Sequence, residues 1–303
     1  FVIEYPYGCA EQRSSKLIVL LNDYCLAKLI GREGDKGEKA RKVIVQGIRG
    51  LAPFQREDGG FGVWVGDGSS LPYLTAYICR LLQRARDEGL LPEEGGGMLD
   101  DAMKYLEEYW KQEQASDEKF YCYWYGSTAF AAKVIAEGGG NADPLINLLM
   151  ENMPKLPSGA LCNLWDAAAR SGKKTSAGKI EAAVRSRIIM SGQSGYLREN
   201  RDDYYYYYWL DDDVATALAL KSFVANTADA DMQFRLAKYL VERGRSRERW
   251  NTHCNANIFE ALAAYVRKQQ SSGSRCKAFC FVDDKKVFEA PLGEKDGFEY
   301  SKK

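Results

Sequence analysis

The sequence predicts an all-α protein, an α/α toroid built of stacked helix pairs, with a short β-like tail at its carboxyl end. Apolar residues recur with helical spacing along most of the chain, and glycine- or aromatic-rich corners such as the one at 55–62 separate about eleven or twelve helical runs. Repeated helix pairs cannot bury their apolar faces alone and must stack on their neighbours. A ring of such pairs satisfies that requirement.

The position of each helix follows from where its apolar pattern begins and ends. The first is expected from Cys9 to Ile30, where Gly31 ends a run that includes Leu17 and Leu21. Further helices with clear bounds are expected at 36–55, 70–87, 127–137, 159–171, 211–226 and 254–269. Small residues permit close approach, so the inner ring is predicted to contain the helices at 70–87, 127–137, 211–226 and 254–269.

The pattern changes after Arg267. The serine-rich stretch at 271–274 reads as a flexible link, and 277–282 with 286–290 read as two strands of a hairpin turned at 283–285. We therefore expect two parts, a toroid domain over residues 1–270 and, over 271–303, a linker with the start of a truncated β-rich domain.

Composition excludes several classes of function. Lys and Arg together number 42, as do Asp and Glu, so the net charge of zero gives no general affinity for nucleic acid or anionic membranes. The apolar runs are shorter than a membrane span, so no direct membrane insertion is expected. The eight cysteines include no C-x-x-C pair, which argues against zinc-ribbon and thioredoxin-type sites. Most lie in apolar helical patterns, and few disulfides or none are expected.

One stretch near the amino end carries chemistry, Tyr5-Pro6-Tyr7-Gly8-Cys9-Ala10-Glu11-Gln12. In a first helical turn, residues three apart share a face with Cβ atoms about 5–6 Å apart, so the thiol of Cys9 can reach the carboxamide of Gln12. Displacement of ammonia would form an internal thioester, and Tyr5 and Tyr7 would shield it from water. A plainer reading is a buried cysteine at a helix start with an exposed glutamine on the next turn.

This octapeptide resembles the thioester motif of the alpha-2-macroglobulin and complement family, and its bacterial members most. Only Ala10 departs from the bacterial pattern. The resemblance implies a thioester domain within a larger secreted or periplasmic protein, beside β-sandwich domains, and it allows a membrane anchor in a part of that protein outside this chain. It further implies a single-turnover inhibitor or defence protein, not an enzyme, that is linked covalently to a lysine of a target protease. Glu11 is assigned a supporting role, and neither a cofactor nor a metal is implied.

In complement-type members that acylate hydroxyl groups, a histidine first takes the acyl group. The only histidine here is His253, and the region at 114–121, where the family's histidine would fall, contains none. The resemblance therefore implies direct transfer to amines.

Two alternatives from other classes stay open. The toroid fold is shared with prenyl- and glycan-processing enzymes, for which the acids at 211–213 could hold a metal, although the dipole of the following helix explains them as well. His253 and Cys254 could be zinc ligands. A simpler interpretation is that they begin a helix capped by Asn251 or Thr252. The chain could also be a non-covalent binding module that keeps the motif without its chemistry. The aromatic run at 204–209 has no assigned role.

Overall fold

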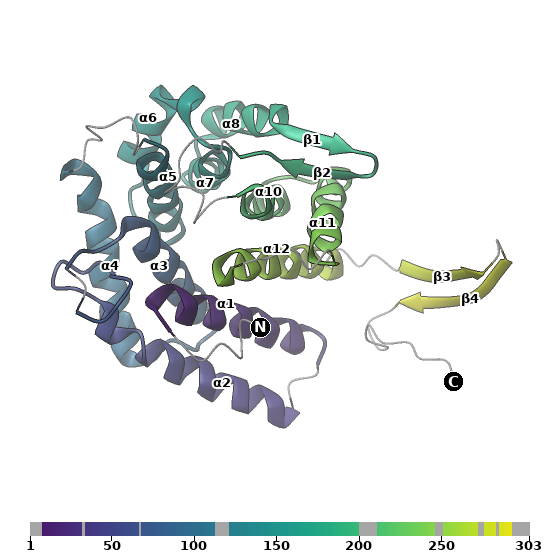
Figure 1. The fold of residues 1–303 in the computed structure, drawn as a ribbon, viewed down its shortest axis with the longest axis horizontal. Coiled ribbons are helices and arrows are strands. Elements are labelled where there is room, and N and C mark those ends of the chain that lie inside the picture. Colours follow the sequence, from purple (N-terminus) through teal and green to yellow (C-terminus); the bar gives the residue numbers. More distant parts are fainter. Residues whose placement is uncertain are drawn as a thin grey trace.

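The computed structural model describes residues 8–31, 34–66, 68–112, 121–199, 211–245 and 251–271, together with the backbone of two further strands. These residues are predominantly helical (Figure 1). The α-helices are α1 (Ala10–Leu29), α2 (Gly34–Arg49), α3 (Pro72–Asp87), α4 (Glu93–Gln112), α5 (Tyr121–Glu137), α6 (Asp143–Glu151), α7 (Ser158–Arg170), α8 (Lys174–Ser186), α10 (Asp212–Asn226), α11 (Ala230–Arg245) and α12 (Thr252–Ser271).

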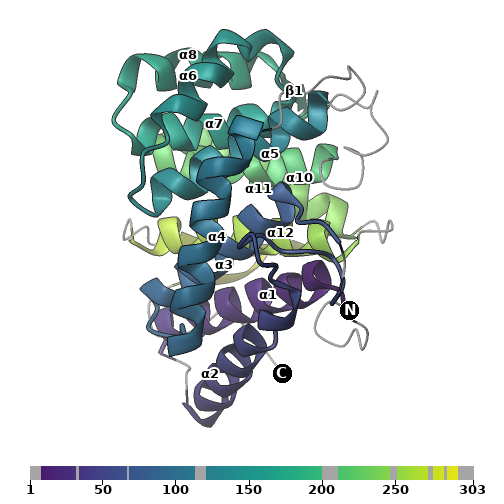
Figure 2. The same cartoon turned by 90° about the vertical axis from the view of Figure 1, so that its left-hand side faces the viewer.

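Six helices form a closed inner ring. In order around it, α1, α3, α5, α7, α10 and α12 each pack against the next, and α12 returns to pack against α1. The helices α2, α4, α6, α8 and α11 cover the ring from outside, as the two views in Figures 1 and 2 show. This arrangement is the predicted α/α toroid, and all four helices expected in the inner ring lie there.

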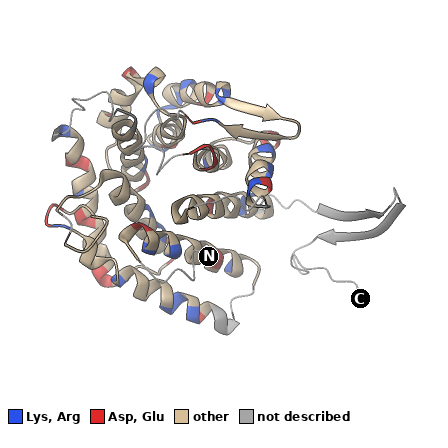
Figure 3. Cartoon of the chain, in the orientation of Figure 1, with Lys and Arg blue, Asp and Glu red and all other residues tan. Residues whose placement is uncertain are grey.

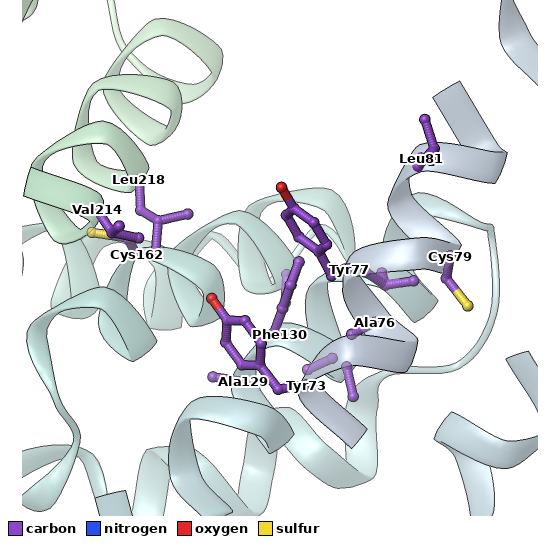
Figure 4. Packing of buried hydrophobic residues seen from close by; sticks show 14 of the residues in the cluster. Tyr73, Ala76, Tyr77, Cys79, Leu81, Ala129, Phe130, Cys162, Val214 and Leu218 are labelled. Atoms are coloured by element: carbon purple, nitrogen blue, oxygen red, sulfur yellow. The ribbon is translucent and has the colours of Figure 1, made fainter. Parts of the chain in front are cut away.

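Small side chains explain why the inner helices can be buried on all sides. In α10, Ala215, Ala217 and Ala219 are fully buried although they point in different directions around the helix. Aromatic side chains fill the remaining space. Tyr73 and Tyr77 extend from α3 beside Phe130 of α5 (Figure 4), and the ring centroids of Tyr73 and Phe130 are 5.1 Å apart.

Buried ion pairs join the inner helices. Arg80 of α3 lies 2.9 Å from Glu260 of α12, and Lys221 of α10 lies 2.8 Å from the same carboxylate. Lys133 of α5 is 2.6 Å from Asp166 of α7. Burial, followed by the neighbouring Arg80 guanidinium, lowers the pKa of Lys221 to about 7. Removing one partner would leave a buried charge uncompensated, so these pairs fix which helices face one another.

The outer surface carries both signs of charge, and the view in Figure 3 shows Lys and Arg interspersed with Asp and Glu on the outer helices. Within the described part of the chain, no helix combines the length and apolar character needed to cross a membrane.

Several boundaries differ from the sequence expectation. The helix expected at 36–55 ends at Arg49 and is followed by a single 3-10 turn, Ala52–Phe54. The helix expected at 127–137 begins earlier, at Tyr121, and ends as expected at Glu137. A hairpin that the sequence did not predict lies between α8 and α10, formed by β1 (Ile188–Ser191) and β2 (Ser194–Leu197), and it turns at Gly192 with φ +58°. The expected tail hairpin is present as β3 (Cys276–Val282) and β4 (Lys285–Leu292).

The corner at 55–62 anchors the start of α3. Gln55 donates to the carbonyl oxygens of Gly59 and Met98, at 3.0 and 2.9 Å, and the backbone of Phe61 donates to the Thr75 hydroxyl at 2.9 Å. Gly59 has φ +86°, and a Cβ there would lie 2.4 Å from the carbonyl oxygen of Asp101. The corner therefore requires glycine for both its backbone angle and its closeness to α4.

Replacement of Gly59 by alanine should lower the free energy of unfolding more than replacement of Gly66. Gly66 has φ +83° but nothing within 4 Å of a new Cβ, so Gly66→Ala carries only the backbone cost of about 1–2 kcal/mol. Gly59→Ala should add about 1–3 kcal/mol from the clash. Denaturant unfolding of both variants measures the difference, and equal values would show that the corner yields without cost.

Candidate functional site

The Cys9–Gln12 turn opens α1 at one end of the inner ring. Cys9 is the residue before the first helical residue, with φ −62° and ψ 166°, and Gln12 is the third residue of the helix. The backbone N–H of Cys9 donates to Oε1 of Gln12 at 3.3 Å, while the Cys9 side chain faces the backbone N–H of Gln12. Each of the two residues that the sequence paired therefore directs its side chain to the backbone N–H of the other.

Backbone contacts hold this turn on the rest of the protein. Ala10 donates its N–H to the carbonyl of Val63 at 3.0 Å, which ties α1 to the loop that follows the 55–62 corner. Arg13 donates from Nε to the carbonyl of Gly8 at 2.9 Å. A Cβ at Gly8 would lie 2.8 Å from that Nε, so the close approach favours glycine. The entry to the helix is therefore fixed on both sides of Cys9.

The environment of the Cys9 thiol disfavours its ionisation. The residue is 6% exposed, and burial raises its pKa. The backbone hydrogen bond from Gln12 opposes this shift, and the Glu11 carboxylate adds to it. Because the thiolate is the reactive form, a free Cys9 is protected from reagents in bulk solvent.

Glu11 is buried in a cluster of hydroxyl groups. Its carboxylate accepts hydrogen bonds from Ser15 Oγ at 2.5 Å and from Thr252 Oγ1 at 2.8 and 3.0 Å to its two oxygens. The Ser15 hydroxyl is in turn 2.9 Å from the hydroxyl of Tyr77. Burial raises the pKa of Glu11, and these hydrogen bonds offset part of the shift. The resemblance assigned this residue a supporting role, and the sequence did not predict its contact with Thr252 of α12.

His253 lies inside the ring, away from solvent. Its ring centroid is 4.9 Å from that of Tyr77 and 5.8 Å from that of Tyr73, and Nε2 is 3.1 Å from Nδ2 of Asn257. Burial, then the Arg80 and Lys221 cations, lower the pKa of His253 to about 3. The imidazole is therefore neutral near pH 7.

The acids at 211–213 have separate structural partners. Asp211 caps α10 by accepting the N–H of Val214 at 2.7 Å, which agrees with the helix-dipole reading. Asp212 accepts the backbone N–H of Glu199 at 2.8 Å, and Asp213 contacts Tyr239 and Arg243. Within the described residues, no group of three or more His, Cys, Asp and Glu side chains is placed to hold a metal ion. The described residues therefore do not support the interpretation of these side chains as metal ligands.

Some predicted residues lie outside the described part of the chain. These are the shielding residues Tyr5 and Tyr7, the region at 114–120 and the aromatic run at 204–209.

Five cysteines are described as free and buried, Cys9, Cys25, Cys79, Cys162 and Cys254. A cavity of about 610 Å³ lies elsewhere, lined by residues that include Leu156, Arg187 and Arg198, and none of the predicted site residues lines it.

Comparison with known proteins supports the resemblance in the amino-terminal part of the chain. Residues 2–121 match the family model of the A-macroglobulin TED domain. The resemblance to the alpha-2-macroglobulin thioester domain is confirmed. Alpha-2-macroglobulin of Escherichia coli strain K12 is 40% identical over 86 residues, which are 28% of this chain and 5% of that protein. The chain therefore spans a small part of this macroglobulin relative.

Solved macroglobulin structures show the same fold. Native E. coli alpha-2-macroglobulin, determined by cryo-EM, aligns with a TM-score of 0.74 and 23% identity over 97% of this chain and 18% of that chain. The crystal structure of Salmonella alpha-2-macroglobulin reacted with methylamine aligns with a TM-score of 0.73 and 21% identity, over 97% of this chain and 19% of that chain. At these identities the structural likeness establishes the toroid fold alone.

The pH dependence of stability should reveal the buried carboxyl of Glu11. Its pKa is raised in the folded protein above the ordinary value of 4.5. Ionisation of the buried carboxyl therefore lowers the stability of the fold as the pH rises from 4.5 to the raised pKa. The isosteric Glu11→Gln variant lacks this cost. The difference between its free energy of unfolding and that of the unsubstituted protein should increase over this pH range. The increase should be about 1.4 kcal/mol for each unit by which the pKa of Glu11 is raised.

Denaturant unfolding between pH 4 and pH 8 measures this difference. Glu94→Gln is a suitable control because Glu94 lies at the solvent-exposed start of α4 and its pKa is lowered, so its effect on stability changes below pH 4.5 and the difference should stay nearly flat above that pH. A difference for Glu11→Gln that stays flat with pH would contradict the assignment.

Proposed function

We propose that this chain is the thioester-bearing domain of a macroglobulin-like protein that traps proteases covalently. The observation that carries the proposal is the reciprocal arrangement of Cys9 and Gln12 at the start of α1. In forming the bond, the Cys9 sulfur attacks the side-chain carbonyl carbon of Gln12, the C–N bond breaks, and ammonia leaves with the thiol proton. The product is a thioester that joins the two side chains.

The reaction with a target is an aminolysis. An unprotonated lysine amine attacks the same carbonyl carbon, the C–S bond breaks, and the sulfur leaves as the Cys9 thiol after taking a proton. The target is then linked to the former Gln12 by an amide bond. Each chain reacts once, so the protein is an inhibitor or defence factor and not an enzyme.

His253 supports a preference for amines over hydroxyl groups. It is buried, neutral and enclosed by Tyr73 and Tyr77, so it is poorly placed to take the acyl group from Gln12 before passing it on. A direct attack then requires a strong nucleophile, which an amine is and an alcohol is not.

The wider setting follows from the relatives. We propose a secreted or periplasmic protein in which proteolysis of a segment elsewhere exposes the thioester, and in which β-sandwich domains adjoin the toroid. A non-covalent binding module remains the competing function, because it would need the same fold without the bond. The prenyl- or glycan-processing alternative loses ground, since each acid at 211–213 has a structural partner.

A biotinylated primary amine should become attached to Gln12 when incubated with the protein, and peptide mapping would locate it. Cys9→Ser should abolish the labelling. Cys25→Ser, which alters another buried free cysteine of α1, should leave it unchanged. Labelled glycerol at the same concentration should give no product. Equal labelling by glycerol, or labelling that persists in Cys9→Ser, would contradict the proposed chemistry.

A further inference from the structure

Glu11 joins the first inner helix to the last. It lies between Cys9 and Gln12 in the first turn of α1 and is 2% exposed. Thr252, in the first turn of α12, approaches both of its carboxylate oxygens, at 2.8 and 3.0 Å. These two residues are 241 positions apart in the chain, and their contact lies where the ring closes.

Among the described residues, hydroxyl groups hold this carboxylate. Ser15 and Thr252 each donate their single proton to Glu11, so the Tyr77 hydroxyl donates to Ser15. Within the described residues, no lysine or arginine pairs with Glu11 at ion-pair distance, and the carboxylate is buried where lost hydrogen bonds are costly. Loss of one of these donors is therefore not compensated by solvent.

The Thr252 hydroxyl is not needed to begin its own helix. Asn251 performs that task, because its Oδ1 accepts the N–H of Cys254 at 2.7 Å. Thr252 is itself buried, at 5% exposure. Its hydroxyl therefore serves the contact with Glu11.

We infer that Thr252 is a positioning residue for the Cys9–Gln12 site, acting through Glu11. By fixing the Glu11 carboxylate, Thr252 and Ser15 hold the backbone of the turn that sets Cys9 against Gln12. The integrity of the acyl site then depends on the closure of α12 against α1. The expected effect of Thr252 on the thioester rests on the proposed function. Its expected effect on the accessibility of Cys9 does not, and can be measured separately.

Three variants of the 303-residue chain test this inference. Thr252→Val removes the hydroxyl with little change of shape, and Thr252→Ser restores it. Thr128→Val is the matched control, because Thr128 is a fully buried inner-helix threonine whose hydroxyl accepts from Tyr109 at 3.0 Å, away from Glu11. The rate measured is the loss of the thioester to water, which leaves Gln12 as a glutamate and frees the Cys9 thiol. Thermal unfolding of each variant is recorded alongside.

Thr252→Val should lose the thioester about tenfold faster than the unsubstituted protein, the ratio expected from one lost hydrogen bond to a charged group. Thr252→Ser and Thr128→Val should lose it at the original rate, even where Thr128→Val lowers Tm. An unchanged rate in Thr252→Val, or an equal acceleration in Thr128→Val, would overturn the inference.

Failure of the proposed function gives a different result. If the unsubstituted chain shows no loss of ammonia by mass, it has no thioester, and alkylation of Cys9 by iodoacetamide becomes the measurement. Thr252→Val should then react about tenfold faster than the unsubstituted chain and Thr128→Val should not. That outcome would remove the acyl chemistry and keep the positioning role. Equal alkylation rates in all variants would overturn the positioning role as well.

Discussion

The packing of α12 against α1 is the constraint on which the rest of the structure depends. It turns a row of helix pairs into a closed ring, and it brings the last inner helix to the turn that contains Cys9 and Gln12. A partly closed toroid would expose α1 on one side and leave the Glu11 carboxylate without its Thr252 donor. The fold and the Cys9–Gln12 turn therefore depend on the same interface, and a change that opens the ring also changes this turn.

Burial decides the reactivity of the site as much as proximity does. Burial raises the pKa of the Cys9 thiol and keeps His253 neutral. Both groups are therefore held in an uncharged, enclosed state. A bond formed between Cys9 and Gln12 would be kept from solvent by the same packing. Its reaction with a lysine of another protein would then require a movement that uncovers the turn, which small amine probes do not need because Gln12 is only partly buried. This is consistent with a trap that stays inactive until the surrounding protein changes shape.

The sequence predicted the parts of this account that depend on local pattern. The alanine-rich run of α10 indicated an inner helix, and the spacing of Cys9 and Gln12 indicated their pairing in one turn. Short strands were harder to predict, since β1 and β2 have only four residues each and their turn resembles the glycine-rich corners elsewhere. The contact between Glu11 and Thr252 could not be predicted, because no local pattern specifies which residue of a distant helix the ring will bring into place.

Intact mass measurement before and after methylamine treatment tests the central claim most directly, with a thiol-specific label mapped to peptides in each case. The account predicts that the fresh protein is lighter by one ammonia and that Cys9 takes no label until methylamine has modified Gln12. A fresh protein of unaltered mass, with Cys9 labelled in the folded chain and Gln12 an intact amide, would contradict it.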